Sequence, residues 1–251
     1  MPGSGGRVAL VTGGSRGIGR ACALALAGDG FDVAVVYRRD EEAALDTVGA
    51  IEALGRRARP YRASVESAPE DEAMVGRVLE DFGAVDTLVH AAGIASRGHS
   101  VVDTDPAELE RVIAIHALGA HHLCRLVIPS MRSAPRGDVV FISSVAAQVL
   151  GPNSSPYNMA KAALEALAMT LAKEERRHGI HVNVVAPGLV VTEMGRRLVR
   201  AMGVQDISTM DANAAFGRVC RPEDVAGVVR FLCSEEAGYL TGQVITVDGG
   251  G

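Results

Sequence analysis

The sequence predicts an α/β fold, a single domain in which a doubly wound parallel sheet of about seven strands carries helices on both faces. Short apolar runs rich in β-branched residues alternate with helical patterns from residue 7 onward. The runs are apolar at consecutive positions, which is typical of strands that are buried on both faces. No linker or change in composition divides the 251 residues. We therefore expect one domain over residues 7–251, after a flexible N-terminal segment of residues 1–6.

The predicted elements follow from these runs and from the residues that bound them. A helical pattern follows the first strand, and residues 40–54 form the next helix, with Asp40 as its N-cap and Gly55 as its stop. A longer helix begins at Ser155 and runs to about His178. Further helices fill the other intervals between strands. The strands are predicted at residues 7–12, 32–37, 58–63, 86–90, 138–143, 180–186 and 244–247.

Composition excludes several classes of function. The chain has 25 Lys and Arg residues against 30 Asp and Glu residues, a formal net charge of −5 at pH 7, which favours no nucleic-acid partner. Charged residues, glycines and histidines interrupt the apolar runs before the ~20 residues that a bilayer requires, and the first six residues lack a signal-peptide pattern. The four cysteines have no CxxC spacing. We therefore expect reduced thiols, no metal site, no membrane partner and a cytoplasmic protein.

The first turn between strand and helix has the spacing of a dinucleotide-binding loop. It reads Thr-Gly-Gly-Ser-Arg-Gly-Ile-Gly over residues 12–19. Glycines let the backbone approach a pyrophosphate, and they let the free N–H groups at the start of the helix face it. The position of the loop, between the first strand and the first helix, predicts a nucleotide site. The residues assigned to this site are Gly13, Ser15, Arg16, Gly17, Ile18 and Gly19.

The end of the second strand indicates which nicotinamide nucleotide fits. An acid here would bind the ribose hydroxyls and repel a 2′-phosphate. The strand ends instead with Tyr37, Arg38 and Arg39, and the first acid is Asp40. Arg38, together with Arg16 from the glycine loop, favours NADP(H) over NAD(H). The alternative is that Arg38 and Arg39 only form the solvated start of the next helix.

A tyrosine and a lysine lie one helical turn apart at the start of the long helix. Tyr157 and Lys161 are spaced i and i+4, so both project from one face. A nearby ammonium group lowers the pKa of a phenol, so the tyrosine gives and takes a proton near neutral pH. Ser143 and Ser144 end the preceding strand, where the ligand-binding groups of such sheets gather. A hydroxyl there can hydrogen-bond a substrate carbonyl.

With these motifs the sequence resembles the short-chain dehydrogenase/reductase family over about residues 7–251, and it is most similar to the β-ketoacyl-acyl-carrier-protein reductases and related ketoreductases. The resemblance implies a Rossmann-like sheet and a catalytic set of Ser144, Tyr157 and Lys161, with His116 at the position of a fourth catalytic residue. Tyr157 and Lys161 also contact the cofactor in this family. The other cofactor contacts that the resemblance implies are Ser64, Val65, Ala92, Gly93, Pro187, Gly188 and Thr192.

Three positions depart from the family pattern. Ser64 stands in place of an Asp that contacts adenine. Ala91 stands in place of an Asn whose amide braces the central sheet, so another group must bind those backbone atoms. His116 stands in place of an Asn that holds a proton relay to the lysine. Three interpretations remain for His116: it takes over the relay, it is a filler whose backbone carbonyl alone matters, or it marks a weakly active or non-catalytic relative.

The remaining expectations concern partners and substrate. Residues 162–172 are apolar on nearly every face of their helix, more than one sheet covers, so we expect a second copy of the chain to cover them; the resemblance implies a homotetramer or a homodimer. The resemblance also implies that residues 193–216 form a substrate lid, and their methionines suit an adaptable apolar pocket. The resemblance implies interconversion of a ketone and a secondary alcohol, with a 3-oxoacyl thioester of a carrier protein or CoA, or a polyketide-like ketone, as substrate. The alternatives are a steroid, sugar or xenobiotic, or a cofactor-binding regulatory relative.

Overall fold

The computed structural model describes residues 6–250, so the predicted flexible segment lies, except for Gly6, outside the described residues. A seven-stranded sheet has the order β3-β2-β1-β4-β5-β6-β7, and every pairing in it is parallel. The predicted doubly wound sheet is confirmed, and each strand end lies within one residue of its predicted position. The strands are β1 (Val8–Thr12), β2 (Asp32–Tyr37), β3 (Ala58–Arg62), β4 (Thr87–His90), β5 (Gly137–Ile142), β6 (Ile180–Pro187) and β7 (Val244–Val247).

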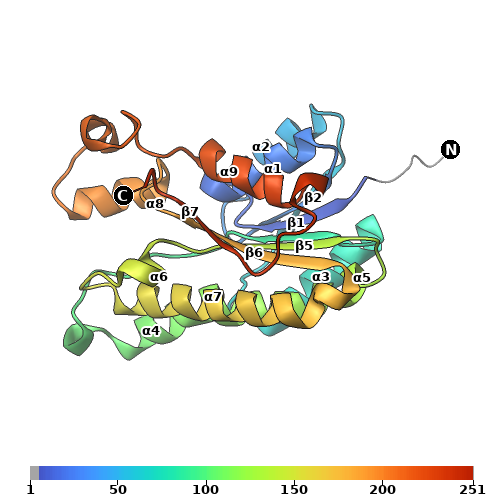
Figure 1. The fold of residues 1–251 in the computed structure, drawn as a ribbon, viewed down its shortest axis with the longest axis horizontal. Coiled ribbons are helices and arrows are strands. Elements are labelled where there is room, and N and C mark those ends of the chain that lie inside the picture. Colours follow the sequence, from blue (N-terminus) through green and yellow to red (C-terminus); the bar gives the residue numbers. More distant parts are fainter. Residues whose placement is uncertain (1–5, 251) are drawn as a thin grey trace.

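Helices cover both faces of the sheet, as predicted (Figure 1). Successive side chains of a strand point to opposite faces, so Leu10 and Val36 enter one buried core while Val11 and Val35 enter the other. The helices on the first of these faces are α3 (Ala68–Phe82), α5 (Gly119–Met131) and α7 (Ser155–Glu175), and those on the second are α1 (Gly17–Gly28), α2 (Glu41–Glu52) and α9 (Pro222–Leu232).

The predicted helix boundaries have clear local causes. The Asp40 carboxylate accepts a hydrogen bond from the N–H of Ala43 at 3.1 Å and caps α2. The chain leaves this helix through Gly55, whose φ is 77°, a left-handed conformation that favours glycine. Beyond α7, a 3₁₀ turn, η3 (Arg176–His178), completes the helix that was predicted to end near His178.

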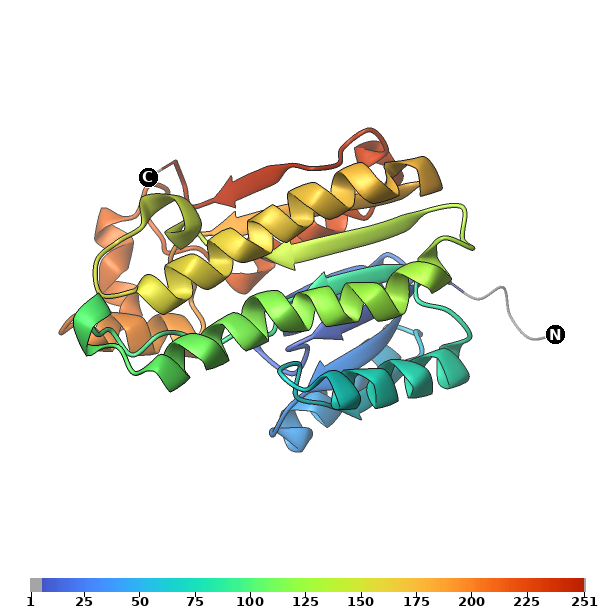
Figure 2. The same cartoon turned by 90° about the horizontal axis from the view of Figure 1, so that it is seen from below.

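One long helical stretch differs from the expectation about membrane spans. It joins α4 (Pro106–Ile113), a π-helical turn η2 (Ala114–Leu118) and α5, and it is straight enough to follow in Figure 2. In the described part of the chain, this stretch is long and apolar enough to cross a bilayer by length and composition, with a mean hydropathy of 1.4. The expectation missed it because glycine, histidines and Arg125 interrupt the apolar run, whereas the mean hydropathy of the stretch remains high. Leu123, Val127 and Met131 are buried in the core, as in a core helix of a sheet.

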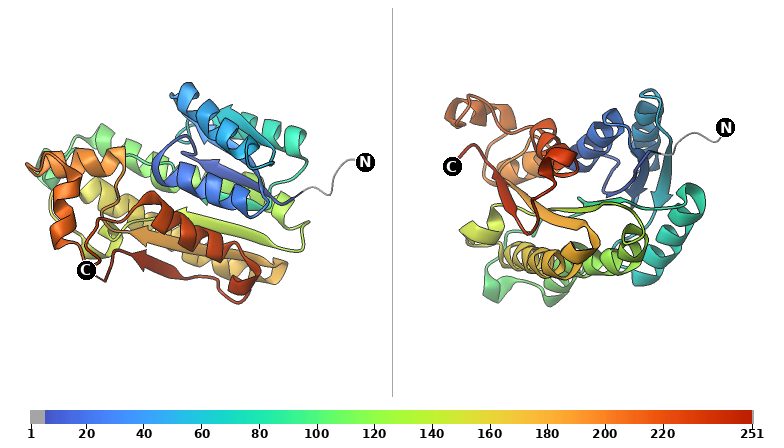
Figure 3. Two further views of the ribbon diagram at one scale, coloured as in Figure 1. Left: turned by 90° about the horizontal axis from the view of Figure 1, so that it is seen from above. Right: turned by 45° about the vertical axis from the view of Figure 1, so that its right-hand side comes forward.

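The segment predicted to form the lid projects beyond the carboxyl ends of the strands (Figure 3). It contains α8 (Glu193–Ala201) and the 3₁₀ helix η4 (Ile207–Asn213). Val199, Ile207 and Val219 form a small buried cluster of their own, separate from the two main cores. The segment therefore has an internal core with which it can hold its shape over the edge of the sheet. The other short helices are η1 (Val101–Asp103), α6 (Ala146–Val149) and η5 (Glu235–Ala237).

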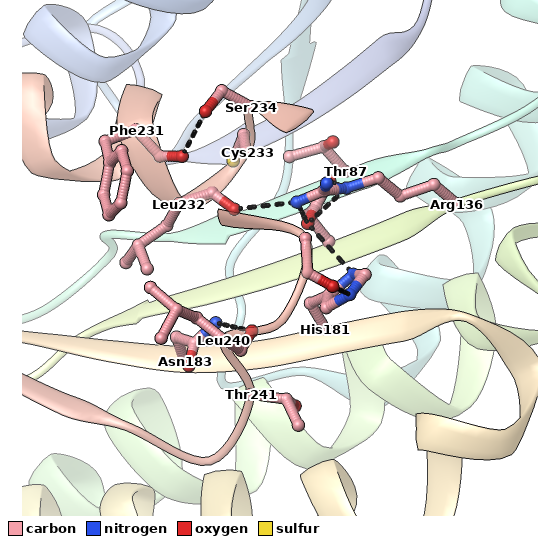
Figure 4. Close-up of polar contacts among 12 residues, drawn as sticks. Thr87, Arg136, His181, Asn183, Phe231, Leu232, Cys233, Ser234, Leu240 and Thr241 are labelled. Atoms are coloured by element: carbon pink, nitrogen blue, oxygen red, sulfur yellow. Dashed lines mark hydrogen bonds and ion pairs between the residues drawn. The ribbon is translucent and has the colours of Figure 1, made fainter. Parts of the chain in front are cut away.

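The amino edge of the sheet is closed by ion pairs around Asp138. This carboxylate is 1% exposed, contacts Arg7, and lies 2.9 Å from Arg136 and 3.6 Å from His181. Arg136 also donates a hydrogen bond to the carbonyl of Leu232 at 3.2 Å (Figure 4). These contacts tie the end of α9 to β5 and β6. The amino edge is therefore bound to the C-terminal segment, and the predicted site lies at the opposite edge.

Candidate active site

The carboxyl edge of the sheet gathers the predicted site residues. The strand order changes direction between β1 and β4, and open α/β sheets bind ligands at such a switch point, outside the carboxyl ends of the strands. Because parallel strands all end at the same edge, loops far apart in sequence meet here. The residues are Gly13 after β1, Arg38 after β2, Ser64 and Val65 after β3, Ala92 and Gly93 after β4, Ser144 after β5, and Pro187 and Gly188 at the end of β6.

The glycine loop between β1 and α1 allows close approach of a phosphate group. Gly13 and Gly17 have positive φ values of 64° and 54°, which favour glycine. A Cβ on Gly19 would collide with the carbonyl oxygen of Gly13, so glycine lets α1 begin against the loop. Arg16 occupies the N-cap position and makes no side-chain capping hydrogen bond within residues 6–250. The first N–H groups of α1 therefore remain available to an anion, which fits a dinucleotide pyrophosphate.

Two further residues of this loop have supporting positions. Ser15 is buried, and its carbonyl accepts a hydrogen bond from the Thr47 hydroxyl at 3.3 Å, which ties the loop to α2. Ile18 packs against the core between the sheet and α1. These contacts hold the loop in place, whereas the backbone around Gly13 and Gly17 forms its open side.

The hydroxyl of Thr12 supplies the brace that Ala91 lacks. Its Oγ1 accepts hydrogen bonds from the N–H groups of Ala91 and Ala92, each at 3.1 Å. Oγ1 also lies 3.1 Å from Nδ1 of His90, so this hydroxyl joins the ends of β1 and β4 through the ring as well as through the two amides. Burial, assisted by the charge of Lys161, lowers the pKa of His90 to about 3, so this ring is neutral at physiological pH.

Arg38 and Arg39 follow the end of β2, and Arg111 lies beside Arg38 because both are near the carboxylate of Glu66, at 3.2 Å and 3.7 Å. Burial, followed by repulsion from Arg39 and Arg111, lowers the pKa of Arg38, and Arg16 contributes in the same direction. Arg16 itself reaches from the glycine loop to the lid, where its Nη1 lies 3.0 Å from the carboxylate of Glu193. This concentration of guanidinium groups at the adenosine end of the site is suited to a phosphate rather than to ribose hydroxyls alone.

The residues after β3 hold an acidic group beside these arginines. The N–H of Ser64 donates to Glu70 at 2.9 Å, and its hydroxyl donates to Glu66 at 3.2 Å. Val65 is buried, and its carbonyl leaves no space for a Cβ on Gly119. Ser64 therefore uses its hydroxyl on a neighbouring carboxylate, and Val65 fixes the loop against α5.

The predicted catalytic residues meet between β5 and α7. Lys161 is 4% exposed, and its Nζ donates a hydrogen bond to the carbonyl of Ile142 at 2.6 Å. Its Nζ lies 5.5 Å from the centre of the Tyr157 ring. Ser144 lies close enough to the Tyr157 hydroxyl to lower the pKa of the phenol, whereas the hydroxyl of Ser143 donates to Glu165 at 2.7 Å. The structure thus brings Ser144, and not Ser143, together with the tyrosine and the lysine.

The protonation of this pair differs from the simple expectation. Burial raises the pKa of Tyr157, and the nearby Ser144 offsets only part of that rise. Burial lowers the pKa of Lys161 to about 7, against a small opposite effect of Glu165. The predicted lowering of the phenol pKa by the ammonium is therefore not found in the cofactor-free protein. Both groups are buried, and burial disfavours the charged form of each.

His116 lies beside the tyrosine, in the π turn η2. The two ring centroids are 5.4 Å apart and the rings meet at 89°. Nε2 of His116 lies 3.1 Å from the backbone N and 2.9 Å from the carbonyl O of Ile94, while Nδ1 is buried without a partner among residues 6–250. Burial and the charge of Lys161 lower its pKa well below the usual value. A Cβ on Gly93 would collide with the imidazole, so glycine makes room for it.

Pro187, Gly188 and Thr192 lie on the lid side of this edge. Gly188 donates its N–H to the carbonyl of Val247 at 3.1 Å, which joins the end of β6 to β7. Thr192 is the N-cap of α8, because its hydroxyl accepts a hydrogen bond from the N–H of Gly195 at 3.0 Å. The lid helix therefore starts at Thr192, one of the cofactor contacts that the resemblance implies.

Sequence reasoning missed the groups that hold the predicted residues. Glu66 stands three positions after the predicted strand end at residue 63, so its place at the carboxyl edge of the sheet could have been predicted. Glu193 is 177 positions from Arg16, and Ile94 is 22 positions from His116; no spacing rule joins such pairs. The hydrogen bonds that Thr12 accepts from Ala91 and Ala92 also depend on β4, which is paired with β1 only in the folded sheet.

Comparisons with known proteins agree with this geometry. Residues 13–251 match the family described as enoyl-(acyl carrier protein) reductase. The L-rhamnose 1-dehydrogenase (NAD(P)(+)) of Sphingomonas sp. strain SKA58 is 35% identical over 98% of this chain and 96% of its own. The 3-oxoacyl-(acyl-carrier-protein) reductase of Staphylococcus aureus is 37% identical over 96% of both chains.

A solved structure extends the similarity to the whole fold. It belongs to a candidate short-chain alcohol dehydrogenase of Sinorhizobium meliloti 1021, is 34% identical and superimposes with a TM-score of 0.90 over 98% of this chain and 96% of that one. The fold, the glycine loop and the Ser144–Tyr157–Lys161 grouping lie within these matched regions. The chain therefore belongs to the short-chain dehydrogenase/reductase family, whose members are NAD(P)(H)-dependent oxidoreductases of alcohols and ketones.

Proposed function

We propose that the chain is an NADPH-dependent ketoreductase that interconverts a ketone and a secondary alcohol. The observation that carries the choice of NADP(H) is that Arg38 and Arg39 follow β2, a strand without an acid at its end, and that Arg111 lies beside Arg38, across the carboxylate of Glu66. A 2′-phosphate is a dianion at neutral pH, and guanidinium groups bind it with charge-assisted hydrogen bonds. Reduction is the direction that a cellular NADP pool kept reduced would drive.

The residues of this chain supply proton transfer and orientation, and the bound nicotinamide supplies or accepts the hydride. Tyr157 passes a proton to the carbonyl oxygen in reduction and takes it back in oxidation. Ser144 donates a hydrogen bond to the same oxygen and polarises the carbonyl. Lys161 holds the nicotinamide ribose and, when protonated, stabilises the phenolate of Tyr157.

His116 is proposed to connect Lys161 with solvent. Two observations support this relay: the ring lies edge-on against Tyr157, and its buried Nδ1 has no partner among residues 6–250. A neutral imidazole both donates and accepts, as a relay requires. His116→Ala measured across pH tests the role, because unchanged turnover and an unchanged pH profile would leave His116 as a filler.

The proposed substrate is a 3-oxoacyl thioester of a carrier protein or CoA, or a polyketide-like ketone. Arg196 and Arg200 are exposed on the lid helix at the carboxyl edge, where they would meet an anionic carrier. Met194 and Met202 are exposed beside them and suit an adaptable apolar pocket. The alternative, a sugar, has its own support, because the L-rhamnose dehydrogenase is as similar over the same length as the acyl-carrier-protein reductase.

We propose a homotetramer or a homodimer as the working unit, and the cytoplasm as its location. Ala162, Ala163 and Ala166 of α7 are exposed in the single chain, and a second copy would cover this face. The free thiols of Cys22, Cys124, Cys220 and Cys233 suit a reducing compartment.

The proposal is tested by following the oxidation of NADPH and of NADH with a panel of 3-oxoacyl thioesters, diketones and sugar lactones, beside Tyr157→Phe. Turnover with NADPH that disappears in the variant would support the reductase. The ranking of the panel separates acyl thioesters from sugars. Turnover with NADH alone would overturn the choice of NADPH. Tight NADPH binding without turnover would direct attention to His116, and His116→Asn would then show whether the family residue restores activity.

A further inference from the structure

An acidic side chain stands among the arginines that are proposed to bind the 2′-phosphate. The carboxylate of Glu66 lies 3.2 Å from Nε of Arg111 and 3.7 Å from Nη1 of Arg38. It also accepts the hydroxyl proton of Ser64 at 3.2 Å. Glu66 follows β3, and Arg38 follows β2, which pairs with β3 in register up to Tyr37 and Arg62. The carboxylate therefore faces the place where the ribose of a bound adenosine would lie.

We propose that Glu66 is a specificity-determining residue that opposes the 2′-phosphate and keeps the preference for NADP(H) over NAD(H) below the level that the arginines alone would give. This inference rests on the proposed function, because it concerns the same cationic site. Glu66 acts in two ways: it offsets the charge of Arg38 and Arg111, and it repels the phosphate dianion directly. A ribose with a free 2′-hydroxyl carries no charge and meets neither effect.

The geometry decides the direction of the effect. If Glu66 oriented Arg38 for the phosphate, its removal would weaken binding. However, the Arg38–Glu66 separation of 3.7 Å is too long for a hydrogen bond. The two hydrogen bonds of Glu66 go instead to Ser64 and Arg111. Ser64 and Arg111 therefore hold Glu66 in place, and Glu66 makes no hydrogen bond that would orient Arg38. The effect of Glu66 on phosphate binding is therefore set by its negative charge.

The size of the effect follows from Coulomb's law. The phosphate carries about −2 charge, and a carboxylate roughly 5–7 Å away in a water-like dielectric changes its binding about tenfold. The Glu66 side chain is 30% exposed, and the effective dielectric near a protein surface is lower than that of water, so tenfold is the smallest effect expected. Added salt screens the interaction, because the Debye length falls to ~3 Å at 1 M ionic strength.

The test compares Glu66→Gln with the wild type by calorimetric titration of adenosine 2′,5′-bisphosphate and of adenosine 5′-monophosphate at low salt and pH 7.5. We expect binding of the bisphosphate that is tighter by about tenfold or more, a much smaller change for the monophosphate, and loss of the difference at 1 M salt. Glu174→Gln is the matched control, because it removes the same charge from an exposed position at the far end of α7. It should change neither titration.

The outcomes separate this inference from the proposed function. Equal or weaker bisphosphate binding in Glu66→Gln would overturn the inference, as would an equal gain for the monophosphate. A wild type that binds the bisphosphate no better than the monophosphate would contradict the proposed choice of NADP(H). A gain in Glu66→Gln would still support the inference in that case. The ratio of kcat/KM for NADPH and NADH should follow the binding ratio.

Discussion

Replacing Lys161 by Met should stabilise the cofactor-free protein near neutral pH. Burial lowers the pKa of Lys161 from 10.5 to about 7. Below about pH 7 the lysine is protonated in both states, and the folded protein carries the cost of holding that charge in a buried position. The corresponding penalty is about 4–5 kcal/mol, from ~1.4 kcal/mol for each unit of pKa. Met fills nearly the same volume but loses the hydrogen bond to Ile142, worth about 1–3 kcal/mol.

The net gain expected for Lys161→Met is therefore about 1–4 kcal/mol at pH 6–7. The sign reverses at higher pH. Between pH 7 and 10.5 the unfolded chain holds more protons than the folded one, so wild-type stability rises with pH through this window. At pH 10.5 the burial penalty is gone, and the variant should be less stable by the lost hydrogen bond alone.

Urea unfolding of both proteins from pH 6 to pH 10, without cofactor and at one protein concentration, measures this crossing. Lys173→Met is the control, because Lys173 is exposed on the same helix and its replacement removes the same charge; it should shift stability by less than about 0.5 kcal/mol. Parallel stability curves for the wild type and Lys161→Met would refute the depressed pKa. Lys161→Met should also lose activity, so stability and catalysis would move in opposite directions.

Three further predictions concern groups around the site. Thr12→Val removes the acceptor of two backbone N–H groups and should cost about 2–3 kcal/mol in urea unfolding, with Thr12→Ser close to the wild type; an equal loss in both would refute the role of the hydroxyl. Gly93→Ala should destabilise the protein because its Cβ meets His116, and His116→Ala should rescue it; additive losses in the double-mutant cycle would contradict the contact. Asp71 is buried without a partner among residues 6–250, and burial raises its pKa to about 7, so the folded state loses stability as pH rises from about 4 to 7. Asp71→Asn should gain about 1–3 kcal/mol at pH 8 and nothing at pH 4; an equal gain at both pH values would show that the charge is not the cause.

The placement of site residues at one edge was predictable because it needs only the strand ends. Each apolar run is closed by glycine, serine or a charged residue, so the ends of β1, β2 and β5 were located to within one residue. Parallel pairing then brings Gly13, Arg38 and Ser144 to the same edge. Placing these residues at one edge therefore requires the strand ends alone, and no information about the side chains that surround them.

The protonation states were not predictable, because they depend on burial and on contacts across the fold. The i, i+4 spacing of Tyr157 and Lys161 indicated that their charges interact, but the depth of burial dominates both pKa values. The replacement of Asn by Ala91 predicted a missing brace. Its substitute, Thr12, is 79 residues away and becomes a neighbour only through the β1–β4 pairing.

The two buried histidines are best understood through the charge balance of the site. Burial keeps His90 and His116 neutral, so Lys161 is the group near Tyr157 that gains or loses a positive charge around pH 7. A phenolate formed on Tyr157 beside protonated Lys161 leaves the pair neutral, whereas beside neutral Lys161 it is an uncompensated buried anion. The proton delivery proposed for Tyr157 would therefore require the protonated form of Lys161. A charged histidine would compete with Lys161 for that positive charge by lowering its pKa further, and burial of both rings prevents it.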